Sequence, residues 1–200
     1  MATKRLPSAE RRKQILHSAI RVFARRSYHG ATTRMISQEA GIAEALIYRY
    51  FSNKQGLFCE AVEHTGKTMV EGLERCLAEH RDDPRGAVRA TLAFYLTLLD
   101  RHEDLARMIF IVSGALDDPL VRKVYLKEQH KALECITQAI ERWQRQGIMR
   151  AQLPARGAAW FFLGTYQTLA LMKESGRLGG VVDLDAAVAL VEPFFVEQGT

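Results

Sequence analysis

Hydroxyl, aromatic and cationic side chains gather between Thr33 and Lys54. Arginine, lysine, threonine and tyrosine donate hydrogen bonds to phosphate oxygens, and an arginine can also pair with two acceptor atoms of a guanine. A glutamate in the same stretch can accept from a cytosine amino group. We therefore expect this segment to contact DNA through the following residues: Thr33, Arg34, Glu44, Ala45, Leu46, Tyr48, Arg49, Tyr50 and Lys54.

The chain that carries these side chains has the pattern of a helix-turn-helix. Gly41 lies at the expected turn, where a glycine adopts a positive φ without the penalty of a Cβ. Ile36 and Ile47 supply an apolar core, and Ser37 is small enough for the two helices to cross closely. The segment 43–50 is then expected to be the recognition helix that enters the major groove.

Several residues of this segment also have an expected role at a helix end. Thr33 is expected to cap the second helix, and its hydroxyl is expected to meet a phosphate as well. Ser52 and Gln55 have the spacing of a capping box, which predicts that a further helix starts directly after Phe51. Lys54 falls in the first turn of that helix, where a cation is unfavourable by roughly 0.3 to 1 kcal/mol. This unfavourable position indicates a phosphate contact.

Glu44 is the acidic residue among the expected DNA contacts. At the start of a helix its charge is favoured by the helix dipole, but it repels phosphate. We hypothesise that Glu44 limits the affinity for non-specific DNA.

Positive charge is concentrated in the N-terminal quarter of the chain. Residues 1–56 carry 11 lysines and arginines against three acidic residues, whereas the remaining 144 residues carry 17 against 20. A solvated basic face would also explain this asymmetry. Because the excess coincides with the helix-turn-helix pattern, a phosphate-binding surface is favoured.

Helical periodicity dominates the rest of the chain and predicts an all-α protein. We expect an N-terminal three-helix DNA-binding domain over residues 1–56. A helical bundle for effector binding and dimerisation is expected over residues 57–200. The expected helices cover about 8–26, then from the Ser52 cap directly after Phe51 to about 80, 85–100, from about 103, 119–146, from 155, and a last helix after Asp183.

The run 157–172 carries no charge. It is shorter than the roughly 20 apolar residues of a membrane span, and Gln167 and Thr168 interrupt it, so we expect no membrane association. Burial against the protein's own core on one face and against a second copy on the other predicts a four-helix bundle in a homodimer. The expected interface residues are Ala159, Phe162, Leu163, Tyr166, Leu169, Ala170, Leu190, Val191 and Phe194.

Large apolar and aromatic side chains of the second domain predict a pocket for a small hydrophobic effector. The candidate pocket residues are Leu92, Tyr95, Leu99, Met108, Phe110, Leu116, Tyr125, Leu133, Trp160, Phe161 and Tyr166. The sequence does not choose among effectors of this class.

The cysteines Cys59, Cys76 and Cys135 are widely spaced in apolar helical patterns. We expect reduced thiols in a cytoplasmic, nucleoid-associated protein. No metal-ligand spacing, phosphate-binding loop or nucleophile motif occurs, so we expect no metal, cofactor or catalytic residue.

The segment from about residue 10 to 60 resembles the tetracycline-repressor-like (TetR) transcription regulators. The residues that carry the resemblance are Thr33, Ile36, Ala40-Gly41, Ile47-Tyr48-Arg49-Tyr50-Phe51, Lys54 and Leu57-Phe58. The resemblance implies an all-α homodimer that binds a palindromic operator and releases it when a small molecule enters the C-terminal domain. It also implies a phosphate contact by Tyr48. Ala43 and Tyr50 depart from the Ser or Thr and the His that are frequent at those positions, which bears on the base sequence that is read.

We therefore predict a ligand-responsive transcriptional repressor and no enzyme. Two alternatives remain open. One is a DNA-binding regulator of the same fold without a small-molecule inducer, and the other is an all-helical enzyme or carrier whose basic face is incidental. A dry, collapsed cavity would favour the first alternative.

Overall fold

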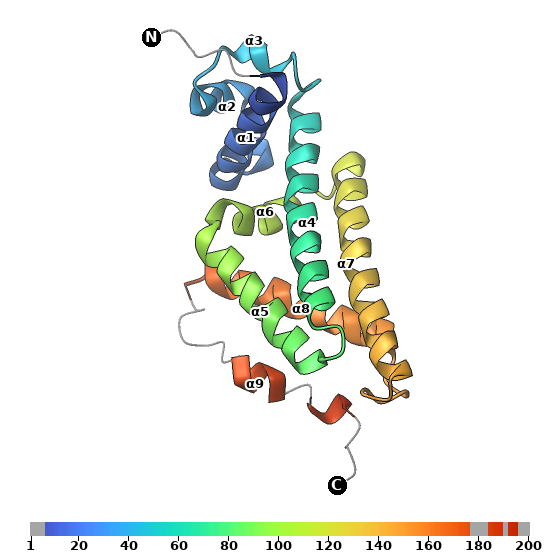
Figure 1. Cartoon of the computed structure of the whole chain (residues 1–200). Coiled ribbons are helices and arrows are strands. Elements are labelled where there is room, and N and C mark those ends of the chain that lie inside the picture. Colours follow the sequence, from blue (N-terminus) through green and yellow to red (C-terminus); the bar gives the residue numbers. More distant parts are fainter. Residues whose placement is uncertain (1–6, 177–183, 190–191, 196–200) are drawn as a thin grey trace. The chain divides into compact units, whose positions relative to one another are not determined.

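The computed structural model describes residues 7–176, 184–189 and 192–195. Its helices (Figure 1) are α1 (Ser8–Gly30), α2 (Thr33–Ala40), α3 (Glu44–Ile47), α4 (Lys54–Glu79), α5 (Pro84–Arg101), α6 (Glu103–Ser113), α7 (Pro119–Arg145), α8 (Ala155–Glu174), α9 (Leu184–Ala189) and the 3-10 helix η1 (Glu192–Phe194). Among the described residues, the β-type backbone pairing is limited to an isolated bridge between Met149 and Phe195. The predicted all-α class is confirmed.

The helices form two compact units. Unit 1 comprises Met1–Thr65 and Asp104–Tyr125, and unit 2 comprises Gly66–Glu103 and Leu126–Thr200. Helices α4 and α7 contribute residues to both units. This grouping differs from the division at residue 56 that the sequence predicts, because part of the segment beyond residue 56 packs with the N-terminal helices.

The core of unit 1 explains the difference. Phe23 of α1 and Phe58 of α4 are fully buried and pack edge to face, with ring centroids 4.9 Å apart. Met108 and Val112 of α6 belong to the same cluster of buried side chains. Unit 1 therefore includes α6 in addition to the three N-terminal helices.

Unit 2 is a helical bundle in which α4 and α7 run side by side (Figure 1). The helices approach closely at Gly66, because a Cβ there would lie 2.7 Å from the Cβ of Glu128. Buried side chains recur at helical spacing on α7 and face the core of this unit. These residues are Leu133, Ile136, Ile140 and Trp143.

Helix α7 begins and ends close to the bounds that its sequence predicts. The side chain of Asp118 caps α7 by accepting from the amide of Leu120 at 2.9 Å. Gly147 ends the helix with a φ of 72°, a left-handed conformation that favours glycine.

All three cysteines are free thiols. Among the described helices, none combines the length and the apolar character that crossing a bilayer requires.

Two helix ends differ from the prediction. The chain leaves helical geometry at Ser27 (φ 59°, ψ 176°), close to the predicted end of the first helix, but α1 then continues to Gly30. The capping box at Ser52 was wrong. Helix α4 begins at Lys54, so Asn53 caps it by accepting from the amide of Gly56 at 2.7 Å, while Gln55 donates to Asp118 instead.

Candidate nucleic-acid interface and effector cavity

The turn between α2 and α3 has the geometry that its sequence predicts. Gly41 adopts a left-handed conformation, with φ 64° and ψ 38°. Ile36 and Ile47 are fully buried on either side of it. Ser37 is also buried, and its hydroxyl donates to the carbonyl of Arg34 at 2.8 Å. The helix-turn-helix prediction is confirmed at the level of single residues.

The recognition segment is less regular than predicted. Helix α3 covers only Glu44–Ile47, and Ala43 offers no side-chain cap. After it the chain tightens into turns in which the amide of Tyr50 bonds to the carbonyl of Ile47 at 3.0 Å, a three-residue spacing. The segment 43–50 therefore presents one short helical turn followed by a tight turn.

The predicted DNA contacts are either exposed or half-buried, and one of the half-buried residues packs against the core. Arg34, Ala45, Tyr48 and Arg49 are exposed, and the Tyr48 side chain is 52% accessible. Thr33, Glu44, Leu46 and Lys54 are half-buried. Tyr50 is also half-buried and packs against the core of unit 1. Phe51, which follows this segment, is buried in the core of unit 1.

The cap of α2 is Thr32, and the prediction of Thr33 was wrong. The Thr32 hydroxyl accepts from the amide of Met35 at 3.2 Å. Two adjacent threonines leave the choice open in the sequence, because either hydroxyl can cap. Thr33 instead lies 2.5 Å from a carboxylate oxygen of Glu44 and 3.0 Å from the hydroxyl of Tyr48. The three side chains form a polar cluster on the outer side of the helix-turn-helix.

Lys54 has partners that the sequence did not indicate. Its ammonium donates to the carbonyls of Tyr28 at 3.0 Å and Ala31 at 3.1 Å, and it lies 4.7 Å from the centroid of the Tyr28 ring. These carbonyls lie at the end of α1, where helical carbonyls lack partners. The contacts explain how a cation is tolerated in the first turn of α4.

Two arginines of α1 are engaged within unit 1. Arg21 and Arg25 form ion pairs with Glu39 of α2, at 2.7 and 3.3 Å. The hydrogen bond from Arg21, together with the charge of Arg25, lowers the pKa of Glu39. These arginines therefore join α1 to α2.

Residues 15–61 match the family model described as "Bacterial regulatory proteins, tetR family". This segment contains α2, α3 and the turn that joins them. Over this segment the chain is similar to the TetR family.

Individual proteins are similar to longer parts of the chain. The transcriptional activator FasR of Mycolicibacterium smegmatis is 31% identical over 53% of this chain and 48% of FasR, so the chain spans about half the length of that relative. The transcriptional regulator BetI of Brucella melitensis is 27% identical over 94% of this chain and 91% of BetI. A solved transcriptional regulator from Saccharomonospora viridis in complex with choline has a TM-score of 0.77 at 24% identity, over 96% of this chain and 100% of that chain.

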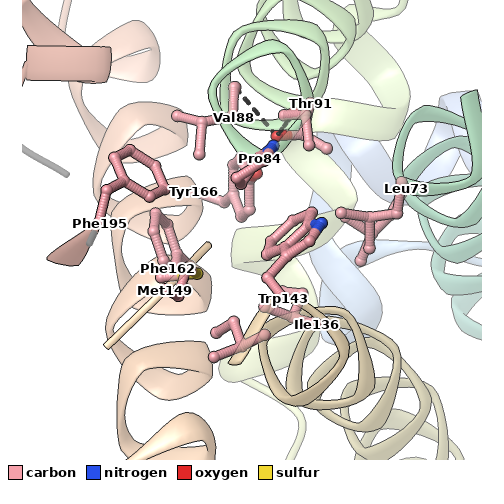
Figure 2. A pocket seen from close by; sticks show the side chains of 13 residues that line it. Leu73, Pro84, Val88, Thr91, Ile136, Trp143, Met149, Phe162, Tyr166 and Phe195 are labelled. Carbon is pink, nitrogen blue, oxygen red and sulfur yellow. Dashed lines mark hydrogen bonds between the residues drawn. The ribbon is translucent and has the colours of Figure 1, made fainter. Parts of the chain in front are cut away.

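Unit 2 contains an apolar cavity of about 30 Å³. Side chains from α4, α5, α7 and α8 converge on it, and Phe195 lies at one edge (Figure 2). Its lining residues are Leu73, Leu77, Pro84, Ala87, Val88, Thr91, Ile136, Ile140, Trp143, Met149, Phe162, Tyr166 and Phe195. Burial raises the pKa of Tyr166 to about 12, so its hydroxyl stays neutral at physiological pH.

Of the candidate pocket residues, only Tyr166 lines this cavity. Leu92, Tyr95, Leu99 and Leu133 are buried elsewhere in unit 2, and Met108, Phe110, Leu116 and Tyr125 lie in unit 1. Trp160 and Phe161 are exposed, by 58% and 72%. Periodicity identifies the apolar face of a helix, but whether a side chain borders a void depends on the helices that pack against it. The lining residues Trp143 and Met149 were missed for this reason.

The expected dimer interface requires a similar correction. Ala159, Leu163, Leu169 and Ala170 are buried within the protomer, and Phe162, Tyr166 and Phe194 are half-buried there. Leu190 and Val191 lie outside the described residues. The exposed face of α8 carries a different stripe: Trp160, Phe161, Gly164, Gln167, Thr168 and Leu171. Both faces of the helix are largely apolar, so its sequence did not indicate which one packs inward.

Proposed function

We propose that the protein is a homodimeric, DNA-binding transcriptional regulator whose α3 enters the major groove of a palindromic operator. The observation that carries the proposal is the outer side of the helix-turn-helix. There Arg34, Tyr48 and Arg49 are exposed over a core formed by Ile36 and Ile47. Donors on a rigid and locally basic support are the arrangement that duplex recognition requires.

Within this proposal the predicted contacts divide into two groups. Thr33, Tyr48 and Lys54 bind phosphate, with Lys54 using an N–H other than those that it donates to α1. Base edges are read from Arg34, Glu44, Ala45, Leu46 and Arg49, with Tyr50 supporting the end of the recognition turn from its half-buried position. An arginine that pairs with guanine supplies the largest share of discrimination in such a set.

The exposed face of α8 is the proposed dimer interface. Trp160 and Phe161 are large apolar side chains, and Leu171, which is 58% exposed, extends the same stripe along the helix. Several large apolar side chains exposed on one helix face are typical of protein interfaces. A second copy of the chain offers the same face, so a two-fold axis would bury both stripes and produce a palindromic operator preference.

The cavity of unit 2 is the proposed effector site, and it favours a neutral, hydrophobic molecule. Among the described residues that line it, aromatic and aliphatic side chains dominate and none carries a carboxylate. A quaternary ammonium such as the choline bound by the Saccharomonospora viridis protein would depend on aromatic faces alone. In this proposal, effector binding makes the protein release the operator, so the regulator is a repressor. It acts in the cytoplasm, at the nucleoid.

The size of the cavity favours a second candidate function. About 30 Å³ is far below the roughly 300 to 1,000 Å³ of typical ligand sites, so an effector would have to enlarge the cavity on binding. A regulator of the same fold without a small-molecule inducer needs no such change. The two candidates share DNA binding and differ only in the response to an effector.

DNA binding is tested by a gel-shift assay with duplex from upstream of the protein's own gene, alongside random duplex. We expect a retarded band at low salt that weakens steeply as salt rises, because several phosphates are neutralised per subunit. The absence of any band at low salt would refute the proposal.

The effector response is tested with the variant Trp160→Phe, which leaves Trp143 at the cavity as the only tryptophan. Neutral N-phenyl-1-naphthylamine is expected to change the Trp143 fluorescence and to release DNA, whereas choline is not. Adding Ala87→Leu, which fills the cavity, should abolish both effects of the neutral probe. If saturating probe changes neither fluorescence nor DNA affinity, the regulator without an inducer is supported instead.

A further inference from the structure

We propose that Glu44 couples base reading to phosphate binding, because it holds the hydroxyl groups of Thr33 and Tyr48 until a base in the major groove draws it away. The inference rests on the proposed DNA-binding function. It goes beyond simple charge repulsion, since it assigns Glu44 two alternative sets of partners.

The chemistry of the three groups fixes the direction of their hydrogen bonds. An ionised carboxylate only accepts, so the Thr33 hydroxyl, 2.5 Å from Glu44, donates to it. The Thr33 hydroxyl has a single hydrogen, which is used in the bond to Glu44. The Tyr48 hydroxyl lies 3.0 Å from the Thr33 oxygen, so Tyr48 donates to Thr33. Both hydroxyl hydrogens therefore point into the cluster.

A phosphate needs these same hydrogens. Its oxygens only accept, and Tyr48 is 52% exposed, so a phosphate can reach this hydroxyl. To bind the phosphate, however, Tyr48 has to give up its bond to Thr33, or Thr33 its bond to Glu44. The charge of Glu44 also repels the phosphate. In the absence of DNA, the cluster keeps two phosphate-binding groups occupied.

Glu44 is well placed to change partners. It is the first residue of α3, and it is half-buried. Side chains at the start of a recognition helix meet base edges, and a cytosine amino group donates to a carboxylate. When Glu44 turns to such a donor, Thr33 and Tyr48 are released for phosphate. On a DNA sequence without this donor, Glu44 gains no new hydrogen bond in exchange for those that Thr33 and Tyr48 give up. Binding to random DNA therefore stays weak.

The test compares random duplex with a duplex selected in vitro by the wild-type protein. We expect Glu44→Ala to bind random duplex roughly tenfold more tightly, a change of about 1.4 kcal/mol, and to lose preference for the selected duplex. In the wild-type background, Tyr48→Phe should barely change the affinity for random duplex, because the Tyr48 hydroxyl already donates its hydrogen to Thr33. In the Glu44→Ala background, the same substitution should weaken binding several-fold.

A matched control is Glu10→Ala, which removes the same charge from unit 1. Glu10 pairs with Lys13 at 3.6 Å and takes no part in the cluster. The inference is overturned if both alanine variants tighten random binding equally, or if Tyr48→Phe costs the same in both backgrounds. Circular dichroism and thermal unfolding check that each variant is folded. A wild-type protein that binds no duplex at low salt would instead refute the proposed function itself.

Discussion

The ammonium of Lys54 donates to the main-chain carbonyl of Ala31, 3.1 Å away and 23 residues earlier in the chain. This bond ties the start of α4 to the end of α1, where helical carbonyls lack partners. The backbone breaks helical geometry at Ser27, next to the second carbonyl acceptor, that of Tyr28. One lysine thus satisfies two acceptors at a helix end that has no glycine cap.

Lys54→Met should lower the free energy of unfolding by about 1 to 2 kcal/mol, because two carbonyls lose a charged donor. Urea denaturation followed by circular dichroism measures the change. Lys13→Met is the control, since Lys13 is exposed and pairs only loosely with Glu10 at 3.6 Å, and it should cost less than about 0.5 kcal/mol. Equal losses in the two variants would contradict the capping role.

The same variant tests the proposed phosphate contact separately. If Lys54 also neutralises a phosphate, Lys54→Met should reduce the slope of log K against log salt by roughly 1 per subunit. Fluorescence anisotropy with labelled duplex over a range of salt concentrations gives this slope. A slope that matches the wild type would assign Lys54 to helix capping alone.

Gly41→Ala should destabilise the helix-turn-helix by roughly 1 to 2 kcal/mol, because a Cβ is unfavourable at its φ of 64°. The space around the residue is open, with no neighbouring atom within 4 Å of the position that a Cβ would take, so the cost is that of the backbone alone. Gly41→Asn should cost less, since asparagine tolerates this conformation better. Gly30→Ala is the control, where a Cβ would meet only ordinary contacts at 3.9 Å. Thermal unfolding measures the stability of each variant. Equal losses of stability in Gly41→Ala and Gly30→Ala would contradict the prediction.

Glu39→Gln should weaken the acid sensitivity of folding. The ion pairs lower the pKa of Glu39, so its contribution is present above the unfolded-state pKa and is lost as the pH falls through the folded-state pKa. The wild type should therefore exceed the variant in stability by roughly 0.5 to 1 kcal/mol at pH 7, and the two should converge as the pH falls below the folded-state pKa of Glu39. Urea titrations at several pH values test this, with Glu10→Gln as the control. A difference that is independent of pH would rule out the ionic origin.

Phe161→Glu should convert the proposed dimer into monomers, because it places a charge on the exposed stripe of α8, at its most exposed large apolar side chain. Phe161 is 72% exposed in the protomer, so the substitution need not disturb the fold. Leu120→Glu, at a residue 54% exposed on α7, is the matched control and should leave the dimer intact. Sedimentation equilibrium distinguishes these outcomes. A dimer that persists in the α8 variant would place the interface elsewhere.

Local sequence signals predicted the turn and the ends of several helices because each depends on a few neighbouring residues. Gly41 adopts the positive φ expected of it, and α7, which Asp118 caps and Gly147 follows, lies within the predicted range 119–146. The adjacent threonines show the limit of such signals. Thr32 and Thr33 have equivalent side chains, and only the course of the chain decides which hydroxyl faces the helix amides.

By itself, the sequence determined the all-α class, the helix-turn-helix and the gathering of positive charge in its N-terminal quarter, since periodicity and composition are properties of the chain. Tertiary structure alone decided which face of α8 is buried, which side chains border the cavity, and that Lys54 and Glu44 have partners within unit 1. These features depend on residues distant in sequence, whose meeting is set by how whole helices pack. A helix that is apolar on both faces, or a charged side chain with several acceptors in reach, has no local signal for that choice.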